Sequence, residues 1–324
     1  MIRWLARRLA VAVLTWMVVT VLLFVLMRLT PGDPLQRLAG DRQVSAQEQE
    51  ALRRRFGIDQ PVATQFRAFL GGALSGDLGV SIEHYPTPVT TLLRTRLPAS
   101  LLLGGTVLVL TFGLGILLGV LQAVRRGTAT DRWLTRASLA LYAMPSFWLG
   151  LVLAWYFGIH LHWLPVAQMH DPLLPVDASW AARTADLLRH LLLPAVTLTA
   201  VSVAAVMRYQ RTALLEVLRR EWVLAARARG LSERRVLWRH AWRSALFPLV
   251  SLLGLWLPIL AAGSVFVEQV FNWPGLGSLA AGAVGARDYP VILGSAMLVS
   301  ALVLLGGILA DVGYYALDPR VRRA

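Results

Sequence analysis

Residues 101–124 read LLLGGTVLVLTFGLGILLGVLQAV, and the interpretation of the whole chain starts from this stretch. It contains no Asp, Glu, Lys or Arg, and it is longer than the roughly 20 apolar residues that a helix needs to cross a bilayer. Within it, Gly115 and Gly119 form a small-xxx-small pair, which lets two helix backbones approach closely. The stretch therefore predicts a transmembrane helix that packs against a neighbouring helix.

Five further apolar runs lie on both sides of this stretch, and each lacks Asp, Glu and Arg. Together they predict six membrane spans, at residues 9–27, 101–124, 137–159, 191–207, 245–267 and 291–310. The run at 191–207 is the shortest. We therefore expect an all-α, polytopic membrane protein with six transmembrane helices. It should divide into a first helix with an outer segment (1–98) and a five-helix core (99–324).

The placement of arginine predicts the orientation in the membrane. Short loops on the cytoplasmic side of a membrane protein carry an excess of basic residues. Arginines crowd the N-terminus, the connection at 125–136, the segment 208–244 and the C-terminus, whereas the short loops between them hold only Arg183, Arg189 and Arg287. We expect both termini to be cytoplasmic, in a multi-pass protein of a prokaryotic inner membrane.

The composition excludes several classes of protein. The chain is 56% hydrophobic and 15% charged, although a soluble domain carries about 25% charged residues. Its net charge of +14 is spread over short segments between apolar runs, whereas a nucleic-acid-binding domain gathers charge on one soluble face. No Lys is present for a P-loop or a Schiff base, and no Cys for a thiolate site. We therefore expect no enzyme activity, nucleic-acid partner, metal or cofactor on this chain.

The segment 208–244 is too long for a simple turn and too short for a catalytic domain. Its pattern predicts a helix, a break and a second helix, with Gly230 as the helix C-cap and Ser232 as the next N-cap. A basic amphipathic helix on anionic lipid is one interpretation. A docking element for a cytoplasmic partner is the other, because small residues beside a glycine break permit close approach. Periodicity alone leaves these two balanced.

Residues 221–246 read EWVLAARARGLSERRVLWRHAWRSAL, and this segment resembles the cytoplasmic EAA loop of ABC importer permeases, specifically of the dipeptide, oligopeptide and nickel permease family. In that loop two alanines, and a glycine a few residues later, belong to a short coupling helix that docks on the ATPase subunit. The position of the motif's glutamate is Leu224 here. We call residues 208–244 the coupling loop. The resemblance implies that it contacts the ATPase through Ala225, Ala226, Arg229, Gly230, Leu231 and Ser232.

Shorter motifs extend this resemblance over nearly the whole chain. They are RLTPGDP at 28–34, PSFWLGL at 145–151, VFNWPGLGSL at 270–279 and RDYP at 287–290. The resemblance implies a fold of the type I ABC importer permease and a homologous second permease as partner. It also implies two cytoplasmic P-loop ATPase subunits that carry ATP and Mg, and an extracytoplasmic binding protein that delivers the substrate. Short peptides are the cargo that we expect.

Two outer regions leave alternatives open. The segment 268–290 is either a packed cap or part of an outer mouth that receives substrate, with Trp273, Pro274, Gly275 and Tyr289 as the candidates. The loop 160–190 contains four histidines, but their spacing matches no defined metal-ligand pattern, so ordinary loop residues are the favoured interpretation.

An ion-coupled secondary transporter is the alternative function. Such a carrier usually has ionisable residues within its spans, and the six predicted spans contain no acidic residue. It would transport alone, whereas the permease that the resemblance implies depends on a separate ATPase.

Overall fold

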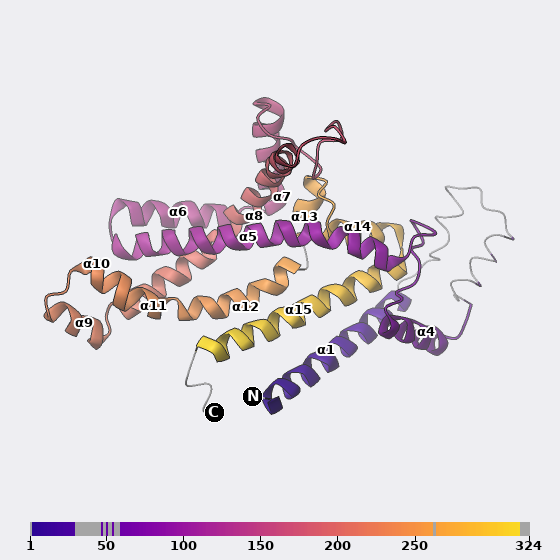
Figure 1. Ribbon diagram of the computed structural model, residues 1–324, viewed down its shortest axis with the longest axis horizontal. Coiled ribbons are helices and arrows are strands. Elements are labelled where there is room, and N and C mark those ends of the chain that lie inside the picture. The colour runs from indigo at the N-terminus through magenta and orange to yellow at the C-terminus, as the bar shows by residue number, and fades with distance from the viewer. Residues whose placement is uncertain are drawn as a thin grey trace. The chain divides into compact units, whose positions relative to one another are not determined.

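The computed structural model describes residues 2–29, 47, 50, 54, 59–261 and 264–317. This part of the chain is helical, and its one β-bridge joins Val80 to Pro88, so the all-α prediction is confirmed there. Figure 1 labels most of the helices. Their bounds are α1 Ile2–Leu29, α4 Val62–Ser75, α5 Val89–Val124, α6 Ala129–Ala143, α7 Ser146–Leu153, η1 Ala154–His160, α8 Trp180–Val217, α9 Glu221–Ala228, α10 Glu233–Arg235, η2 Val236–Ala241, α11 Trp242–Ala245, α12 Phe247–Ala261, α13 Val265–Val270, α14 Leu276–Ala286 and α15 Tyr289–Leu317.

Four helices of the described part are long and apolar enough to cross a membrane. They lie at Ala6–Leu26, Val89–Val124, Trp180–Val217 and Tyr289–Ile308, and they contain or closely match the predicted spans 9–27, 101–124, 191–207 and 291–310. The run at 191–207 looked short because it is the apolar middle of a 38-residue helix. At 1.5 Å per residue that helix is about 57 Å long, so it extends well beyond a bilayer core of about 30 Å.

The predicted span 137–159 is not one helix, which corrects the sequence-based assignment. It is divided between α6 and the pair α7–η1, which are bent by 101° relative to each other. The break lies at Met144 and Pro145, both of which have extended backbone (ψ 132° and 130°). Proline lacks an N–H and disfavours a helical conformation in the residue before it, which explains the position of the break.

The predicted span 245–267 is also interrupted. Its apolar helix α12 has 15 residues, and residues 262–263 lie outside the described part of the chain. The described helices therefore give four spans, or five if the bent pair counts as one, and the predicted count of six is not confirmed.

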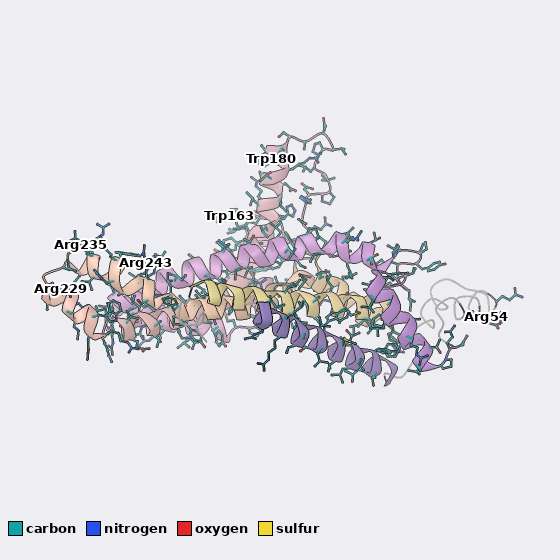
Figure 2. The ribbon with its side chains drawn as sticks, turned by 60° about the horizontal axis from the view of Figure 1, so that its bottom comes forward. Arg54, Trp163, Trp180, Arg229, Arg235 and Arg243 are labelled. Atoms are coloured by element: carbon teal, nitrogen blue, oxygen red, sulfur yellow. The ribbon has the colours of Figure 1, made fainter. Side chains whose placement is uncertain are left out.

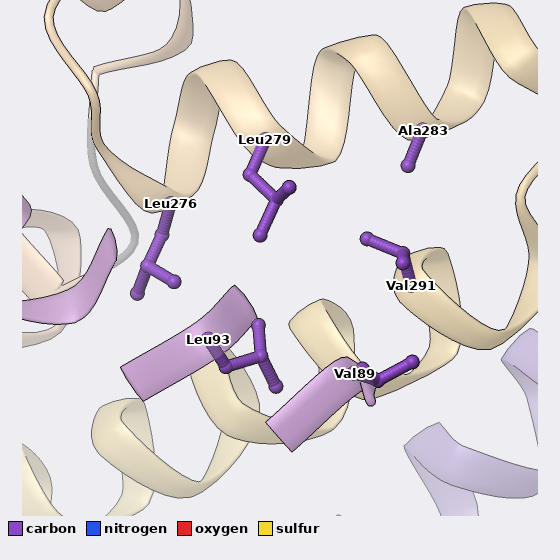
Figure 3. Close-up of a cluster of buried hydrophobic side chains, with 6 residues drawn as sticks. All are labelled: Val89, Leu93, Leu276, Leu279, Ala283 and Val291. Atoms are coloured by element: carbon purple, nitrogen blue, oxygen red, sulfur yellow. The ribbon is translucent and has the colours of Figure 1, made fainter. Parts of the chain in front are cut away.

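The chain forms two compact units, which we describe separately. The first combines the described residues up to 100 with 264–265 and 274–304. Its core joins the start of α5 to α14 and the start of α15 (Figure 3), through Val89, Leu93, Leu276, Leu279, Ala283 and Val291. Gly294 lies against this core, because a Cβ there would stand 2.7 Å from the Val89 side chain.

The second unit contains residues 101–261, 266–273 and 305–317. Within it, α5 and α8 pack at the predicted glycine pair. A Cβ on Gly115 would lie 2.6 Å from the Val206 Cβ, and one on Gly119 would lie 2.6 Å from the Met207 carbonyl oxygen. These distances leave no room for a side chain, so the predicted close approach of two helices at Gly115 and Gly119 is confirmed.

Candidate functional site

The coupling loop folds as the predicted helix, break and helix. Helix α9 ends in a Schellman turn, in which Gly230 has a φ of 78° and donates its N–H to the Arg227 carbonyl (2.9 Å). The Leu231 N–H points to the Ala226 carbonyl at 3.4 Å. A positive φ is unfavourable for a residue with a Cβ, which explains the glycine. Ser232 starts α10 with an extended backbone, but its side chain makes no capping hydrogen bond.

The inner side of the coupling loop is a small apolar core. Val223 and Ala226 of α9 and Val236 of η2 are buried there, and Leu231 packs against them from the turn. Ala226 is therefore a packing residue of the loop itself. A larger side chain at this position would first disturb the loop, whatever it also did to a partner.

The outer side of α9 faces solvent. We call the exposed residues on this side the α9 face: Trp222, Leu224, Ala225, Ala228 and Arg229. Trp222 is 45% exposed and Leu224 is 50% exposed. Of the six residues predicted to contact the ATPase, Ala225, Arg229, Gly230 and Ser232 are exposed, Leu231 is half-buried and Ala226 is buried.

An ion pair closes the turn at Gly230. The Arg227 guanidinium donates to both Glu233 carboxylate oxygens, from Nε at 2.8 Å and from Nη2 at 3.1 Å. Both residues are substantially exposed, so the pair contributes about 0–1 kcal/mol. Further along, Arg235 and Arg243 project from the same segment as Arg229 (Figure 2).

The coupling loop is anchored to the long helices of its own unit. Ala213 and Leu214 of α8 share a buried cluster with Val120 and Ala123 of α5, and with Ala241 of η2 and Ala245 of α11. The loop is thus continuous with α8 through the chain and with α5 through packing. A displacement of the loop would therefore reach both helices.

The candidates for an outer mouth are mostly enclosed. Trp273 is fully buried, and its backbone N–H donates to the Glu268 backbone carbonyl at 2.7 Å. Gly275 is buried, whereas Pro274 and Tyr289 are half-buried. The burial of Trp273 favours the packed-cap interpretation for that residue, and the assignment of the other three to an outer mouth stays a prediction.

Two of the loop histidines form a hydrogen-bonded anchor. His170 Nδ1 and His190 Nδ1 each lie 3.1 Å from a carboxylate oxygen of Asp186, which also accepts the Asp171 N–H. These contacts fasten the loop to the first part of α8. These two histidines therefore have a structural role, which their spacing in the sequence did not indicate.

Sequence reasoning did not predict the burial of three acidic residues: Asp131, Glu268 and Asp288. Asp288 accepts N–H groups from Glu83 (3.0 Å) and Val291 (3.3 Å) and the Ser81 hydroxyl, so it caps α15. Glu83, His84 and Asp288 place potential metal-ligand atoms within 4.8 Å of one another, but these hydrogen bonds already account for Asp288. Asp131 had a signal in the sequence, since Thr128 three residues earlier forms a capping motif with it.

The sequence is related to known transport proteins over its full length. Residues 115–323 match the family described as binding-protein-dependent transport system inner membrane component, and residues 1–96 match its N-terminal family. The chain is 37% identical to a di/tripeptide transport system permease protein of Pseudomonas aeruginosa over 99% of both chains. It is 37% identical to an oligopeptide permease of Bacillus subtilis over 94% of both chains, and 34% identical to a glutathione permease of Escherichia coli over 99% of both. Together with the apolar helices and the coupling loop, these matches place the chain in the peptide-permease branch of the binding-protein-dependent inner-membrane components, as a permease subunit of an ABC importer.

Proposed function

We propose that this chain and a second, homologous permease form the pathway through which short peptides enter the cell. An extracytoplasmic binding protein delivers the peptide, and two cytoplasmic P-loop ATPase subunits bind ATP and Mg. The α9 face and the turn at Gly230 dock on one ATPase subunit. Closure of the ATPase pair then moves the coupling loop, and α8 and α5 carry that motion into the membrane.

The observation that carries this proposal is the shape of the α9 face. Ala225 and Ala228 are exposed on it, and Gly230 beside them leaves open space around its Cα. Small side chains bury little area in a lipid surface, which favours large apolar and long basic groups. They do let the backbone of α9 enter a groove on another protein. Trp222, Leu224 and Arg229 on the same face would also suit a bilayer, so the choice of a protein partner rests on the exposed small residues together with the resemblance of this segment to the EAA loop.

The orientation and the cargo have separate support. The arginine-rich connections support cytoplasmic termini, an orientation in which the coupling loop lies where ATP is available. Peptides are the cargo named for the relatives from Pseudomonas aeruginosa and Bacillus subtilis. In the proposed transporter this chain supplies the pathway, while the binding protein selects the peptide.

A pull-down from the native membrane tests the proposal. The tagged chain is extracted in mild detergent, its partners are identified by mass spectrometry, and ATPase activity is measured with and without the co-purifying binding protein and a peptide mixture. We expect a second permease, P-loop ATPase subunits and peptide-stimulated hydrolysis. A solitary chain that takes up peptide in vesicles under a proton gradient, without ATP, would support the ion-coupled alternative.

A further inference from the structure

Asp131 and Arg211 form a partly buried ion pair within the second unit. Asp131 is only 5% exposed, whereas the Arg211 side chain is 30% exposed. Its two carboxylate oxygens accept from Arg211 Nε at 3.1 Å and Nη2 at 2.9 Å, which is a two-point contact. The same carboxylate also accepts the Gly127 N–H at 3.0 Å. Charged groups are rarely buried without a specific partner, so this geometry holds both residues in place.

The pair joins two parts of the chain that are 80 residues apart in sequence. Asp131 lies in the first turn of α6, directly after the turn that ends α5. Arg211 lies on α8, less than two turns before that helix ends at Val217 and the chain leads into α9. The pair therefore fastens the α5–α6 turn to the first part of the coupling loop, which is still helix α8.

Other contacts make this junction one block. The Gln122 side chain on α5 donates to the Asp131 carbonyl (3.3 Å) and to the Thr135 hydroxyl (3.0 Å). One turn before it on α5, Gly119 packs directly on α8 at Met207. Figure 1 shows α6 running beside the C-terminal half of α5, in agreement with these bonds.

We propose that Asp131 and Arg211 are a positioning pair for energy coupling, which makes the α5–α6 turn move together with α8 when the coupling loop is displaced. The inference rests on the proposed docking of the coupling loop. A long helix that moved alone would slide past α6. The two-point contact transfers the displacement of α8 to α6 and, across the α5–α6 turn, to α5.

The matched comparison is a second acid–arginine pair near the end of α8. Arg220 Nη2 donates to Glu216 Oε1 at 2.6 Å, but both side chains are more than half exposed (60% and 66%). This pair joins residues only four positions apart, in the last turn of α8 and at the N-cap of α9, and it does not bridge α8 to the α5–α6 turn. Its removal should leave coupling unchanged, although it lies closer to α9 than Arg211 does.

The test uses the complete transporter with its binding protein in proteoliposomes. Asp131→Asn keeps the shape and the acceptor for Gly127, and Arg211→Lys keeps the positive charge but cannot make the two-point contact. We expect each variant to lower the number of peptides imported per ATP hydrolysed by about 5- to 100-fold, with little change in basal ATPase rate. The double variant should match the single variants, because both changes remove the same contact. Glu216→Gln is the control and should behave as wild type.

The outcomes separate coupling from stability and from the proposed function. A purely structural pair would lower the melting temperature and the yield but leave the peptide-to-ATP ratio unchanged, and that result would overturn the inference. If Asp131→Asn does not accumulate in the membrane, Arg211→Lys alone decides. Gly230→Asp is run in parallel. If it uncouples transport and Arg211→Lys does not, only this inference fails; if neither uncouples, the proposed docking fails as well.

Discussion

Substitution of Gly230 distinguishes a docking surface from an ordinary helix end. Gly230 has a φ of 78°, and a Cβ built on it meets no atom within 4 Å. A Cβ there would therefore not clash with the described part of the chain, and the main intramolecular effect that we expect is backbone strain. If the turn at Gly230 lies against an ATPase subunit, the same side chain would project into the interface.

The magnitudes of these two effects differ enough to be separated. A non-glycine residue in the left-handed region costs roughly 1–2 kcal/mol, and Asn and Asp visit that region more readily than other residues. For Gly230→Asp we therefore expect a loss of about 1 kcal/mol in the stability of the turn. Arg227 and Glu233 still bridge the turn. A loop weakened by so little remains folded, whereas a charge placed in a desolvated interface abolishes docking.

The assay compares Gly230→Asp with Gly230→Asn, which has nearly the same shape and the same strain but no charge. We expect both variants to reach the membrane and to melt within a few degrees of wild type. Transport and ATPase stimulation by the binding protein should be abolished in Gly230→Asp and reduced less in Gly230→Asn. Normal stimulation in Gly230→Asp, or equal losses in both variants together with a large fall in melting temperature, would refute the reasoning.

Three further predictions concern packing and use the melting temperature of the detergent-extracted complex. Gly119→Ala should destabilise the protein by about 1–3 kcal/mol, because the new Cβ would overlap the Met207 carbonyl oxygen. Gly113→Ala on the same helix is the control and should have little effect, because its Cβ would meet no atom of the described chain within 4 Å. Equal effects of the two substitutions would contradict the packing of α5 on α8 at Gly119. Gln210→Leu should stabilise by about 1–3 kcal/mol because the buried amide has no partner in the described chain, and a lower melting temperature would show that the assembled transporter supplies one. Trp273→Ala should cost about 3–5 kcal/mol and lower the amount of protein in the membrane; unchanged stability with reduced uptake would instead place Trp273 in an outer mouth.

Local chemistry predicted much of the fold. Four of the apolar runs predicted long apolar helices correctly, because uncharged segments of that length are rare outside membrane spans. Gly115 and Gly119 predicted the α5–α8 contact, because a helix surface without side chains lets another backbone approach closely. The division of the span 137–159 was only partly visible. Pro145 indicates a kink, but hydropathy carries no information on a bend of 101°.

The sequence predicted the helix–break–helix motif of the coupling loop, but not which of its residues are exposed. The turn at Gly230 follows from the sequence, since few other residues adopt a positive φ without strain. Periodicity could not assign Ala225 to the exposed side of α9 and Ala226 to the inner core, because neighbouring alanines are equally compatible with either side. The contact between Asp131 and Arg211 was also beyond prediction, because no local rule connects residues 80 positions apart.

Site-specific photo-crosslinking from the α9 face tests the docking of the coupling loop most directly. A photoreactive amino acid is placed at Ala225, which is exposed, and separately at Val176, which is 92% exposed in the predicted outer loop 160–190. In native membranes we expect the probe at Ala225 to capture a P-loop ATPase subunit, with a yield that changes when ATP is trapped, and the probe at Val176 to capture none. Crosslinks from Ala225 to lipid alone would contradict the docking of the coupling loop on an ATPase subunit and would support a helix that lies on the membrane surface.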